Sequence, residues 1–237
     1  MNLPKNQYVE DRQVVFCPSL ARLEVSELIV ECHNCHRYFA ACCLHSSFGG
    51  DLYEPEKSHC EHGKLVFTDG ACSNNGSAQA KAGLGISIGG EGGLHDHSWS
   101  ISVDDSVDFE APRTNQRAEL LAAIEGLNRL ELASQHDVSH GHKPAFDRQH
   151  TKEDRATYVV VTDSEYVVKG ITEWFPSWRK RGWRTSDGKR PTNLDLFMRL
   201  DDFITTLEED RVVVGFWRVP RAFNHAADAL AKRAVKS

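Results

Sequence analysis

The sequence predicts a mixed α/β fold, with one central sheet and helices on both of its faces. Three observations lead to this prediction. The 237 residues are 40% hydrophobic and 26% charged, which provides enough apolar side chains for a buried core. Apolar residues alternate with a period of two in some stretches and recur at helical spacing in others. These stretches follow one another in the order β-β-β-α-β-α-α-β-α, which is typical of a single mixed sheet.

The first three strands are predicted to form an antiparallel meander. KLVFTD (64–69) is a short apolar run that ends on an acid, and residues 70–76 supply turn-forming side chains. In the next two stretches, apolar residues alternate with small ones, as expected for strands with one buried face. The apolar positions are Leu84, Ile86 and Ile88 in one stretch, and Trp99, Ile101 and Val103 in the other.

Helical and strand patterns then alternate toward the C-terminus. The continuous β-branched run Tyr158–Val161 is typical of a strand buried on both faces. Pro176 predicts either a break in its helix or a new first turn. The expected elements are helix 114–132, strand 158–161, helices 166–178 and 196–207, strand 212–219 and helix 226–235.

The composition changes near residues 61–63, and we place a domain boundary there. Six of the seven cysteines precede residue 61, so residues 1–63 are predicted to be a Cys/His-rich N-terminal segment and residues 64–237 the main domain. Residues 133–157 are polar and show no periodicity, which predicts an exposed loop insertion. Four histidines in that stretch leave a metal site open as an alternative to a solvated loop.

The cysteines of the N-terminal segment are spaced as in small zinc modules. The pattern C-x-x-C followed by a second pair of Cys or His residues suits a tetrahedral zinc ion, and free buried thiols are the competing interpretation. C-x-x-C-H (32–36) also fits the haem-attachment string, but haem attachment needs an oxidising compartment. The candidate zinc ligands are Cys32, Cys35, Cys43 and Cys60, with His45 and His62 as alternatives to the last two.

Charge and hydropathy exclude several classes of protein. The net charge of -6 argues against a basic surface over the whole chain, although it leaves room for a local basic patch. No stretch reaches the roughly 18 apolar residues that a membrane span requires. The first residues, MNLPKNQYVEDRQ, have no apolar signal core. We therefore expect a monomer in the nucleus or cytoplasm that is neither secreted nor bound to a membrane.

Acidic residues stand at positions where a site is expected to form. Asp69 and Asp163 each follow a predicted central strand, and sites in open α/β sheets lie beyond the carboxyl ends of strands. Glu119 lies in the first turn of a predicted helix, and Asp228 lies among the alanines of the last one. Each acid alone is typical of a turn, a cap or a surface position. Four converging carboxylates would repel one another unless divalent cations such as Mg²⁺ or Mn²⁺ bound between them.

Four segments of the chain carry a family pattern: LVFTDGACSNNG (65–76), RTNQRAELLAAIEGL (113–127), VVVTDSEYVVKGITEWFPSWRKRGWRTSDGK (159–189) and ADALAKRA (227–234). On these segments, residues 64–237 resemble type 1 ribonuclease H over essentially the whole length of that domain. The resemblance implies an RNase H-like five-stranded mixed sheet, with three antiparallel strands followed by parallel ones. It also implies that two metal ions hydrolyse the RNA strand of RNA–DNA hybrids, giving 5′-phosphate and 3′-hydroxyl ends.

The same resemblance assigns site residues. The catalytic metal ligands would be Asp69, Glu119, Asp163 and Asp228, which would hold two Mg²⁺ ions, with Mn²⁺ as a substitute. The substrate contacts would be Cys72, Asn75, Asn115 and Gln116 toward RNA; Tyr166, Trp174 and Ser186 toward DNA; Thr114 and Asn193 at a DNA phosphate; and Arg221 at the scissile phosphate.

The segment 165–190 would be the basic protrusion of the family, because it carries seven basic and three acidic residues among interleaved aromatic ones. An amphipathic helix with a core-facing aromatic stripe is the alternative interpretation of that segment. We expect Ile171 and Trp178 to belong to the core, and Trp174 to serve both roles.

One departure from the family pattern concerns a histidine. Many members carry a mobile histidine ten residues before the last aspartate, where this chain has Arg218, in a predicted strand that is followed by a shortened loop (219–225). His225 is nearby and would have either a catalytic part or a surface or capping role. Two alternatives to a stand-alone nuclease are a hybrid- or duplex-binding module with a degenerate centre, and the nuclease of a retroelement polyprotein.

Overall fold

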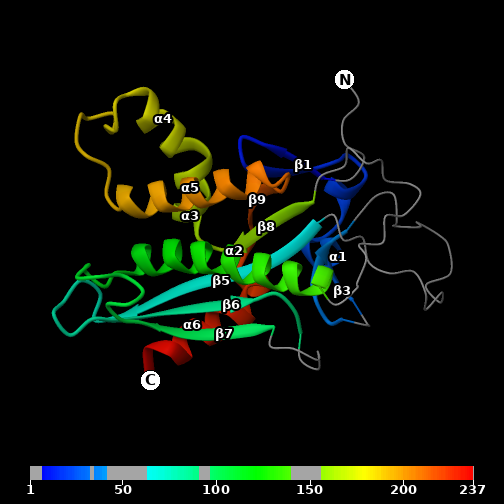
Figure 1. The fold of residues 1–237 in the computed structure, drawn as a ribbon, viewed down its shortest axis with the longest axis horizontal. Helices are drawn as coiled ribbons and strands as arrows, with labels where there is room; N and C mark the ends of the chain where they lie inside the picture. The colour runs from blue at the N-terminus through cyan, green and yellow to red at the C-terminus, as the bar shows by residue number, and fades with distance from the viewer. Residues whose placement is uncertain (1–6, 33–34, 42–62, 91–96, 140–155, 237) are drawn as a thin grey trace.

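The computed structural model describes residues 7–32, 35–41, 63–90, 97–139 and 156–236. From residue 63 onward, the order of elements is the predicted one (Figure 1). The strands are β5 (Gly63–Ser73), β6 (Lys81–Ser87), β7 (Ser98–Val103), β8 (Thr157–Thr162) and β9 (Val213–Arg218). The helices are α2 (Asn115–Ser139), α3 (Glu165–Lys169), a π-helical turn (Gly170–Trp174), α4 (Phe175–Lys180), α5 (Leu194–Glu209), a 3-10 turn (Arg221–Phe223) and α6 (His225–Lys236).

These five strands form the predicted mixed sheet in the order β7-β6-β5-β8-β9. β5, β6 and β7 pair antiparallel, whereas β8 pairs parallel to both β5 and β9. Side chains on opposite faces of β5 and β8 belong to different apolar clusters: Val66 and Val160 to one, Leu65 and Val159 to the other. This alternation follows from the two-residue period of a strand, and it leaves both faces to be covered by other elements.

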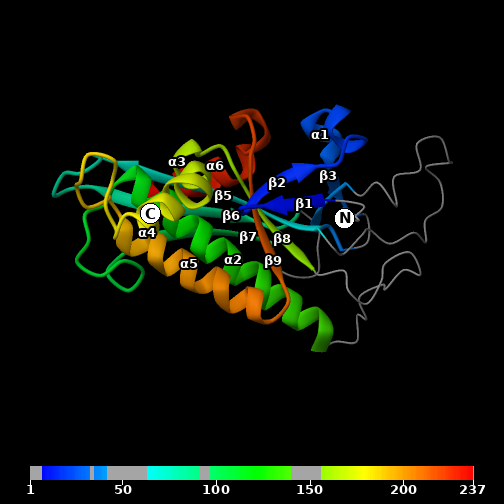
Figure 2. The ribbon, with the colours of Figure 1, turned by 90° about the horizontal axis from the view of Figure 1, so that it is seen from above.

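Helices α2 and α5 contribute to the larger cluster, while α6 packs against β6 and β5 (Figures 1 and 2). Glycines allow α6 to come close, because a Cβ atom on Gly85 would lie 1.9 Å from the carbonyl oxygen of Ala227. The small residues of β7 face the same helix. Ser100 and Ser102 donate hydrogen bonds of 2.8 Å to carbonyl oxygens of α6. The alternating serines of the sequence therefore fix the helix that carries Asp228.

The described part of the N-terminal segment joins the same sheet. β1 (Gln7–Glu10) and β2 (Gln13–Phe16) form a hairpin beside β9. The pair β3 (Ile29–Glu31) and β4 (Tyr38–Ala40), preceded by the short helix α1 (Val25–Leu28), lies beside the first residues of β5. Val14 and Ala40 pack into the second cluster with Leu65 and Val159. The boundary near residue 63 stays a prediction, but these strands share a core with the main domain.

The loop insertion predicted over 133–157 is wrong in its first part, because α2 continues to Ser139. Local hydrogen bonds support this polar extension: Ser134 donates to the Leu130 carbonyl oxygen at 2.8 Å, and Gln135 donates to Glu131 at 2.7 Å. Residues 140–155, and with them three of the four histidines, lie outside the described residues.

The region around Pro176 settles the alternative left open by the sequence, since Pro176 stands in the first turn of α4, directly after the π-helical turn. Ile171 and Trp178 are buried, as predicted, and Trp174 is half-buried against the same core. Among the residues that the structure describes, no helix combines the length and the apolar character that crossing a membrane would require.

Candidate active site

The four predicted acids come together at one end of the parallel strands, and we call them the acid cluster: Asp69, Glu119, Asp163 and Asp228. Asp163 directly follows β8, as predicted. Asp69 does not end its strand, because β5 continues to Ser73 through its pairing with β6. The pairing of β5 with β8 nevertheless stops at Phe67, so Asp69 stands just beyond the point where the two strands separate.

Glu119 reaches the acid cluster because α2 approaches β5 very closely. A Cβ atom on Gly70 would lie 2.2 Å from the backbone nitrogen of Glu119, so the glycine after Asp69 makes room for the helix. Ser164, which follows Asp163, donates a hydrogen bond of 2.6 Å to Glu119 Oε2. The same hydroxyl accepts the backbone N–H of Val167 and caps α3. One serine therefore connects Glu119 to the end of β8.

Asn224 connects two strand ends to the start of α6. It is fully buried, and its Nδ2 donates to the Thr68 carbonyl oxygen at 3.0 Å and to Asp163 Oδ1 at 2.7 Å. The backbone N–H of Asp228 donates to the Asn224 carbonyl oxygen. The side chain of Asp228 is ion-paired to Arg221 through Oδ1 and to Lys232 through Oδ2, the latter at 2.7 Å.

The electrostatics of the acid cluster are those of crowded like charges. Burial, together with the negative charges of Asp163, Asp228 and Glu119, raises the pKa of Asp69 from 3.8 to about 7. Burial also raises the pKa of Glu119, against the hydrogen bond from Ser164. Burial alone would raise the pKa of Asp228, but the hydrogen bonds from Lys232 and Arg221 lower it overall.

These acids could hold divalent cations, which would relieve the repulsion at Asp69. In the described part of the chain, however, no three His, Cys, Asp or Glu side chains are placed so that they could hold a metal ion as they stand. Each of the other three carboxylates is turned toward a donor of the protein: Glu119 toward Ser164, Asp163 toward Asn224, and Asp228 toward Arg221 and Lys232. The donor set fits hard cations, while its role as a ligand set stays a prediction.

The predicted RNA contacts gather where β5 ends and α2 begins. The side chain of Asn75 accepts a hydrogen bond of 3.0 Å from the backbone N–H of Asn115. Asn115 and Gln116 are exposed, whereas Cys72 is half-buried. Burial raises the pKa of the Cys72 thiol, so this side chain is a neutral group on the strand.

The predicted DNA contacts Tyr166, Trp174 and Asn193 lie together, and Asn193 also contacts Arg117 of α2. Asn193 Nδ2 donates to the Tyr166 hydroxyl at 3.0 Å, and the Tyr166 and Trp174 rings pack edge to face with their centroids 5.8 Å apart. Thr114 Oγ1 accepts the Arg117 backbone N–H at 3.3 Å. Ser186 is exposed in the loop between α4 and α5, and no described contact joins it to this group.

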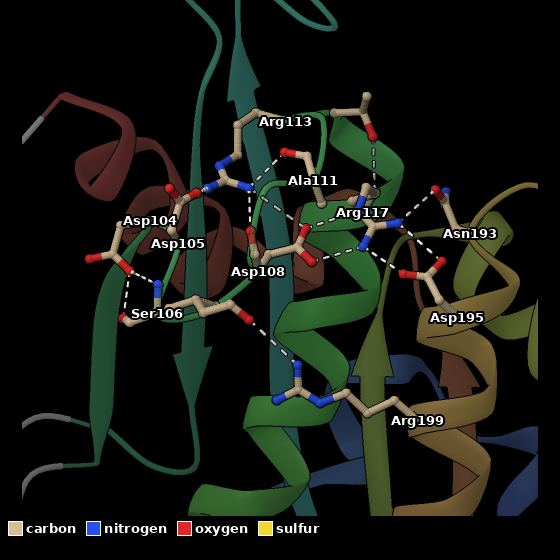
Figure 3. Close-up of polar contacts among 12 residues, drawn as sticks. Asp104, Asp105, Ser106, Asp108, Ala111, Arg113, Arg117, Asn193, Asp195 and Arg199 are labelled. Atoms are coloured by element: carbon tan, nitrogen blue, oxygen red, sulfur yellow. Dashed lines mark hydrogen bonds and ion pairs between the residues drawn. The ribbon is translucent and has the colours of Figure 1, made fainter.

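Sequence reasoning missed a charged group around Arg117, which we call the arginine network: Arg117, Asp108 and Asp195, together with Asn193, the one member that was predicted as a site residue. Figure 3 shows Arg117 between Asp108 and Asp195, and its guanidinium donates to both carboxylates at 2.7–3.1 Å. It also donates to Asn193 Oδ1 at 3.4 Å. Arg117 is 7% exposed. The one signal in the sequence that could have revealed this network was the basic residue Arg117 at a core-facing position of α2, where an apolar side chain is expected.

Arg218, at the position predicted to replace the family's histidine, is the last residue of β9 and pairs with Glu165 at 2.9 Å. Arg221 pairs with Asp228, as described above. His225 is exposed at the start of α6.

Two of the four predicted zinc ligands, Cys43 and Cys60, lie outside the described residues. Cys32 is buried and Cys35 is half-buried, and the backbone N–H of Cys35 approaches Cys32 Sγ at 3.5 Å. Burial raises the pKa of the Cys35 thiol to about 11.

Fold and site together define a class: an α/β protein whose acids gather where the parallel strands separate. The family model for RNase H matches residues 61–236. A ribonuclease H of Cyanothece sp. (strain PCC 7425 / ATCC 29141) is 34% identical over 168 residues, which cover 70% of this chain and 85% of the relative. A ribonuclease H of Nitrosomonas eutropha is 35% identical over 175 residues, covering 73% and 89%.

Ribonuclease H1 of Rattus norvegicus is 29% identical over 178 residues, which cover 73% of this chain but only 50% of the rat protein. The match thus spans about half the length of that relative. The chain belongs to the ribonuclease H family, and the resemblance to its type 1 members is confirmed. Members of this family depend on divalent metal ions.

Proposed function

We propose that this chain is an endoribonuclease that hydrolyses the RNA strand of RNA–DNA hybrids and leaves 5′-phosphate and 3′-hydroxyl ends. The observation that carries this proposal is the convergence of four acids from four separate elements in a chain of the ribonuclease H family. Acids brought together from β5, α2, the end of β8 and α6 are costly to bury, and the fold does not neutralise Asp69.

Asp69, Glu119, Asp163 and Asp228 would hold two Mg²⁺ ions, for which Mn²⁺ is a substitute. When bound, such ions activate a water molecule and stabilise the charge on the leaving oxygen of a phosphodiester. The fit rests on the donors, because carboxylate oxygens are the ligands that these hard cations prefer. It also rests on the raised pKa of Asp69, which a nearby cation would lower again.

The protein's own groups would orient the acids. Ser164 holds Glu119, and Asn224 holds Asp163 against the backbone of β5. Arg221 and Lys232 hold Asp228 and would have to share it with a cation. Arg221 is exposed and lies beside the acids, so it would bind the scissile phosphate; its guanidinium stays protonated and is no general base.

The predicted RNA contacts and the predicted DNA contacts would bind the two strands of the hybrid. Amides and small polar groups can donate to and accept from the 2′-hydroxyls that only the RNA strand carries. The proposed RNA contacts are Cys72, Asn75, Asn115 and Gln116, and the proposed DNA contacts are Tyr166, Trp174, Ser186, Thr114 and Asn193.

The variant Asp163→Asn tests the proposal with a labelled RNA–DNA hybrid, with and without Mg²⁺. We expect cleavage by the unmodified chain only with Mg²⁺, and a loss of about 10³-fold in the variant, equivalent to roughly 4 kcal/mol of transition-state stabilisation. Asp202→Asn, an exposed acid on α5, is the control and should cleave normally. If the unmodified chain binds the hybrid without cutting it, the chain is a binding module instead.

We also propose that Cys32 and Cys35 contribute two ligands to a structural zinc ion, with Cys43 and Cys60 as the remaining ones. The close approach of the Cys35 N–H to Cys32 Sγ supports a turn that presents both thiols together. Elemental analysis of the purified chain should find about one zinc per molecule. The variant Cys32→Ser should contain no zinc. If the unmodified chain itself contains no zinc, the zinc proposal is wrong and the four cysteines are free thiols.

A further inference from the structure

The hairpin of the N-terminal segment has a turn that is fixed against the central sheet. Asp11 and Arg12 connect β1 to β2, and both have a positive φ, 46° and 66°. Two successive residues with positive φ are what a tight two-residue hairpin turn requires. The Arg12 carbonyl oxygen accepts the backbone N–H of Phe216 in β9 at 2.7 Å. The position of Arg12 is therefore set by the sheet.

From this turn, the Arg12 side chain reaches α5. Its Nη1 donates to Asp201 Oδ1 at 2.6 Å, across 189 residues of sequence. The other oxygen of Asp201 accepts from Arg179 of α4. The Asp201 side chain is 8% exposed, so it depends on both guanidinium groups for the compensation that a buried carboxylate needs. One buried acid thus joins the N-terminal hairpin to residues 165–190, the predicted basic protrusion, which we call the basic segment.

Arg179 is the first residue of the basic run Arg179–Lys180–Arg181. Its guanidinium lies 5.0 Å from the ring centre of Phe175 and 5.8 Å from that of Trp183. Because Arg179 is paired and stacked at once, it fixes the end of α4 and the start of the following loop. The neighbouring side chains Lys180 and Arg181 are exposed. The position of these exposed charges relative to the sheet is set through Asp201.

We propose that Arg12 is a positioning residue for substrate binding: through Asp201 and Arg179, the N-terminal hairpin holds the basic segment in the orientation that binds the hybrid. This inference rests on the proposed function. The Arg12 side chain is 20% exposed and is paired with Asp201, so its effect would be on the arrangement of other charges. A ligand surface that is held in place before binding loses less conformational entropy on binding.

The full-length variant Arg12→Met tests the proposal by steady-state cleavage of a hybrid in Mg²⁺. We expect KM to rise about fivefold to tenfold while kcat stays within about twofold, because binding is weakened and the acid cluster is untouched. Arg12→Lys keeps the charge and should restore part of the loss. Arg22→Met removes an equal charge from an exposed position of the same segment and should leave KM unchanged.

Two further measurements separate this inference from the proposed function. In an Asp201→Asn background, Arg12→Met should add no further increase in KM, because the pair is already broken. Amide hydrogen exchange should accelerate in peptides from 175–190 of Arg12→Met, but not in peptides from α2. An unchanged KM, an unchanged exchange rate in 175–190, or an equal effect of Arg22→Met would overturn the inference. A chain that cuts no hybrid at all would remove the proposed function, while the exchange rates would still decide whether Arg12 braces the segment.

Discussion

The acid cluster and the arginine network meet at the start of α2, where Arg117 and Glu119 are two residues apart, but they balance their charges in opposite ways. Arg117 is buried between Asp108 and Asp195, and its hydrogen bonds to both, Asp108 first, raise its pKa. In the acid cluster, Asp69 is surrounded by three further carboxylates, and its pKa rises because burial and repulsion disfavour its charge. The fold therefore neutralises a buried charge where that charge connects elements. It leaves negative charge in excess where we propose that cations bind.

The largest effect is expected from breaking the balanced side with Arg117→Met. This change leaves Asp108, whose side chain is 8% exposed, as a buried carboxylate without its bidentate partner. Removing one member of a buried ion pair costs about 3–5 kcal/mol of unfolding free energy. Chemical denaturation monitored by circular dichroism measures this loss.

Arg129→Met on the same helix is the control for that experiment. Arg129 pairs with Glu125 one turn away and is 34% exposed, so its loss should cost less than about 1 kcal/mol. If both variants lost equal stability, the arginine network would be no more important than an ordinary surface pair.

A smaller effect of opposite sign is expected from Asp69→Asn in the metal-free protein. The pKa of Asp69 in the folded chain, about 7, lies above its ordinary value of 3.8. The folded state is therefore destabilised relative to the unfolded chain as the pH rises from about 4 to about 7. Removing the charge should stabilise the protein at pH 8 by up to about 4 kcal/mol. Calorimetric melting at several pH values measures the gain.

The pH dependence distinguishes electrostatic relief from a general packing change. The gain of Asp69→Asn should shrink as the pH is lowered from 8 toward 5, because Asp69 of the unmodified chain then takes up its proton. An equal or lower melting temperature at pH 8 would contradict the repulsion. The same variant should cleave no hybrid.

The smallest effect concerns the basic segment, where the structure separates charges that the sequence treats alike. All three side chains of the run Arg179–Lys180–Arg181 are exposed, but Arg179 is also paired with Asp201 and stacked on aromatic rings. We expect Lys180→Glu with Arg181→Glu to weaken hybrid binding and to reduce the slope of log K against log salt, on the order of one for each lost phosphate contact. Fluorescence anisotropy at several salt concentrations measures the slope, and an unchanged slope would remove the segment from the binding surface.

Much of the fold and the acid cluster could be predicted because local periodicity carries them. Leu84 and Ile86 of the two-residue alternation lie on β6, with Ile88 just beyond its end, and the β-branched run before Asp163 lies on β8. The aspartates after the strands pointed to a common edge, and the structure brings all four acids there. The strand that carries Asp69 was predicted to end at that residue, but β5 continues to Ser73. Only the pairing with β6 decides where β5 ends.

The N-terminal strands could not be predicted in the same way. β1 to β4 are three or four residues long, too short for a period to be visible, and they are strands because the edges of the main sheet offer them partners. The end of α2 was missed for a related reason. Residues 133–139 show no apolar periodicity in the sequence, and the side chains of Ser134 and Gln135 instead hydrogen-bond back to Leu130 and Glu131.

The sequence by itself determined the order of the main elements and the kinds of side chain at the acid cluster, because both depend on residues that are neighbours in the chain. Only the tertiary structure decided the partners of Arg12 and Arg117. Arg12 finds Asp201 at a separation of 189 residues, and Arg117 finds Asp195 at a separation of 78. A charged side chain has no preferred partner until the backbone has folded, since the ion pair forms with whichever opposite charge is buried beside it.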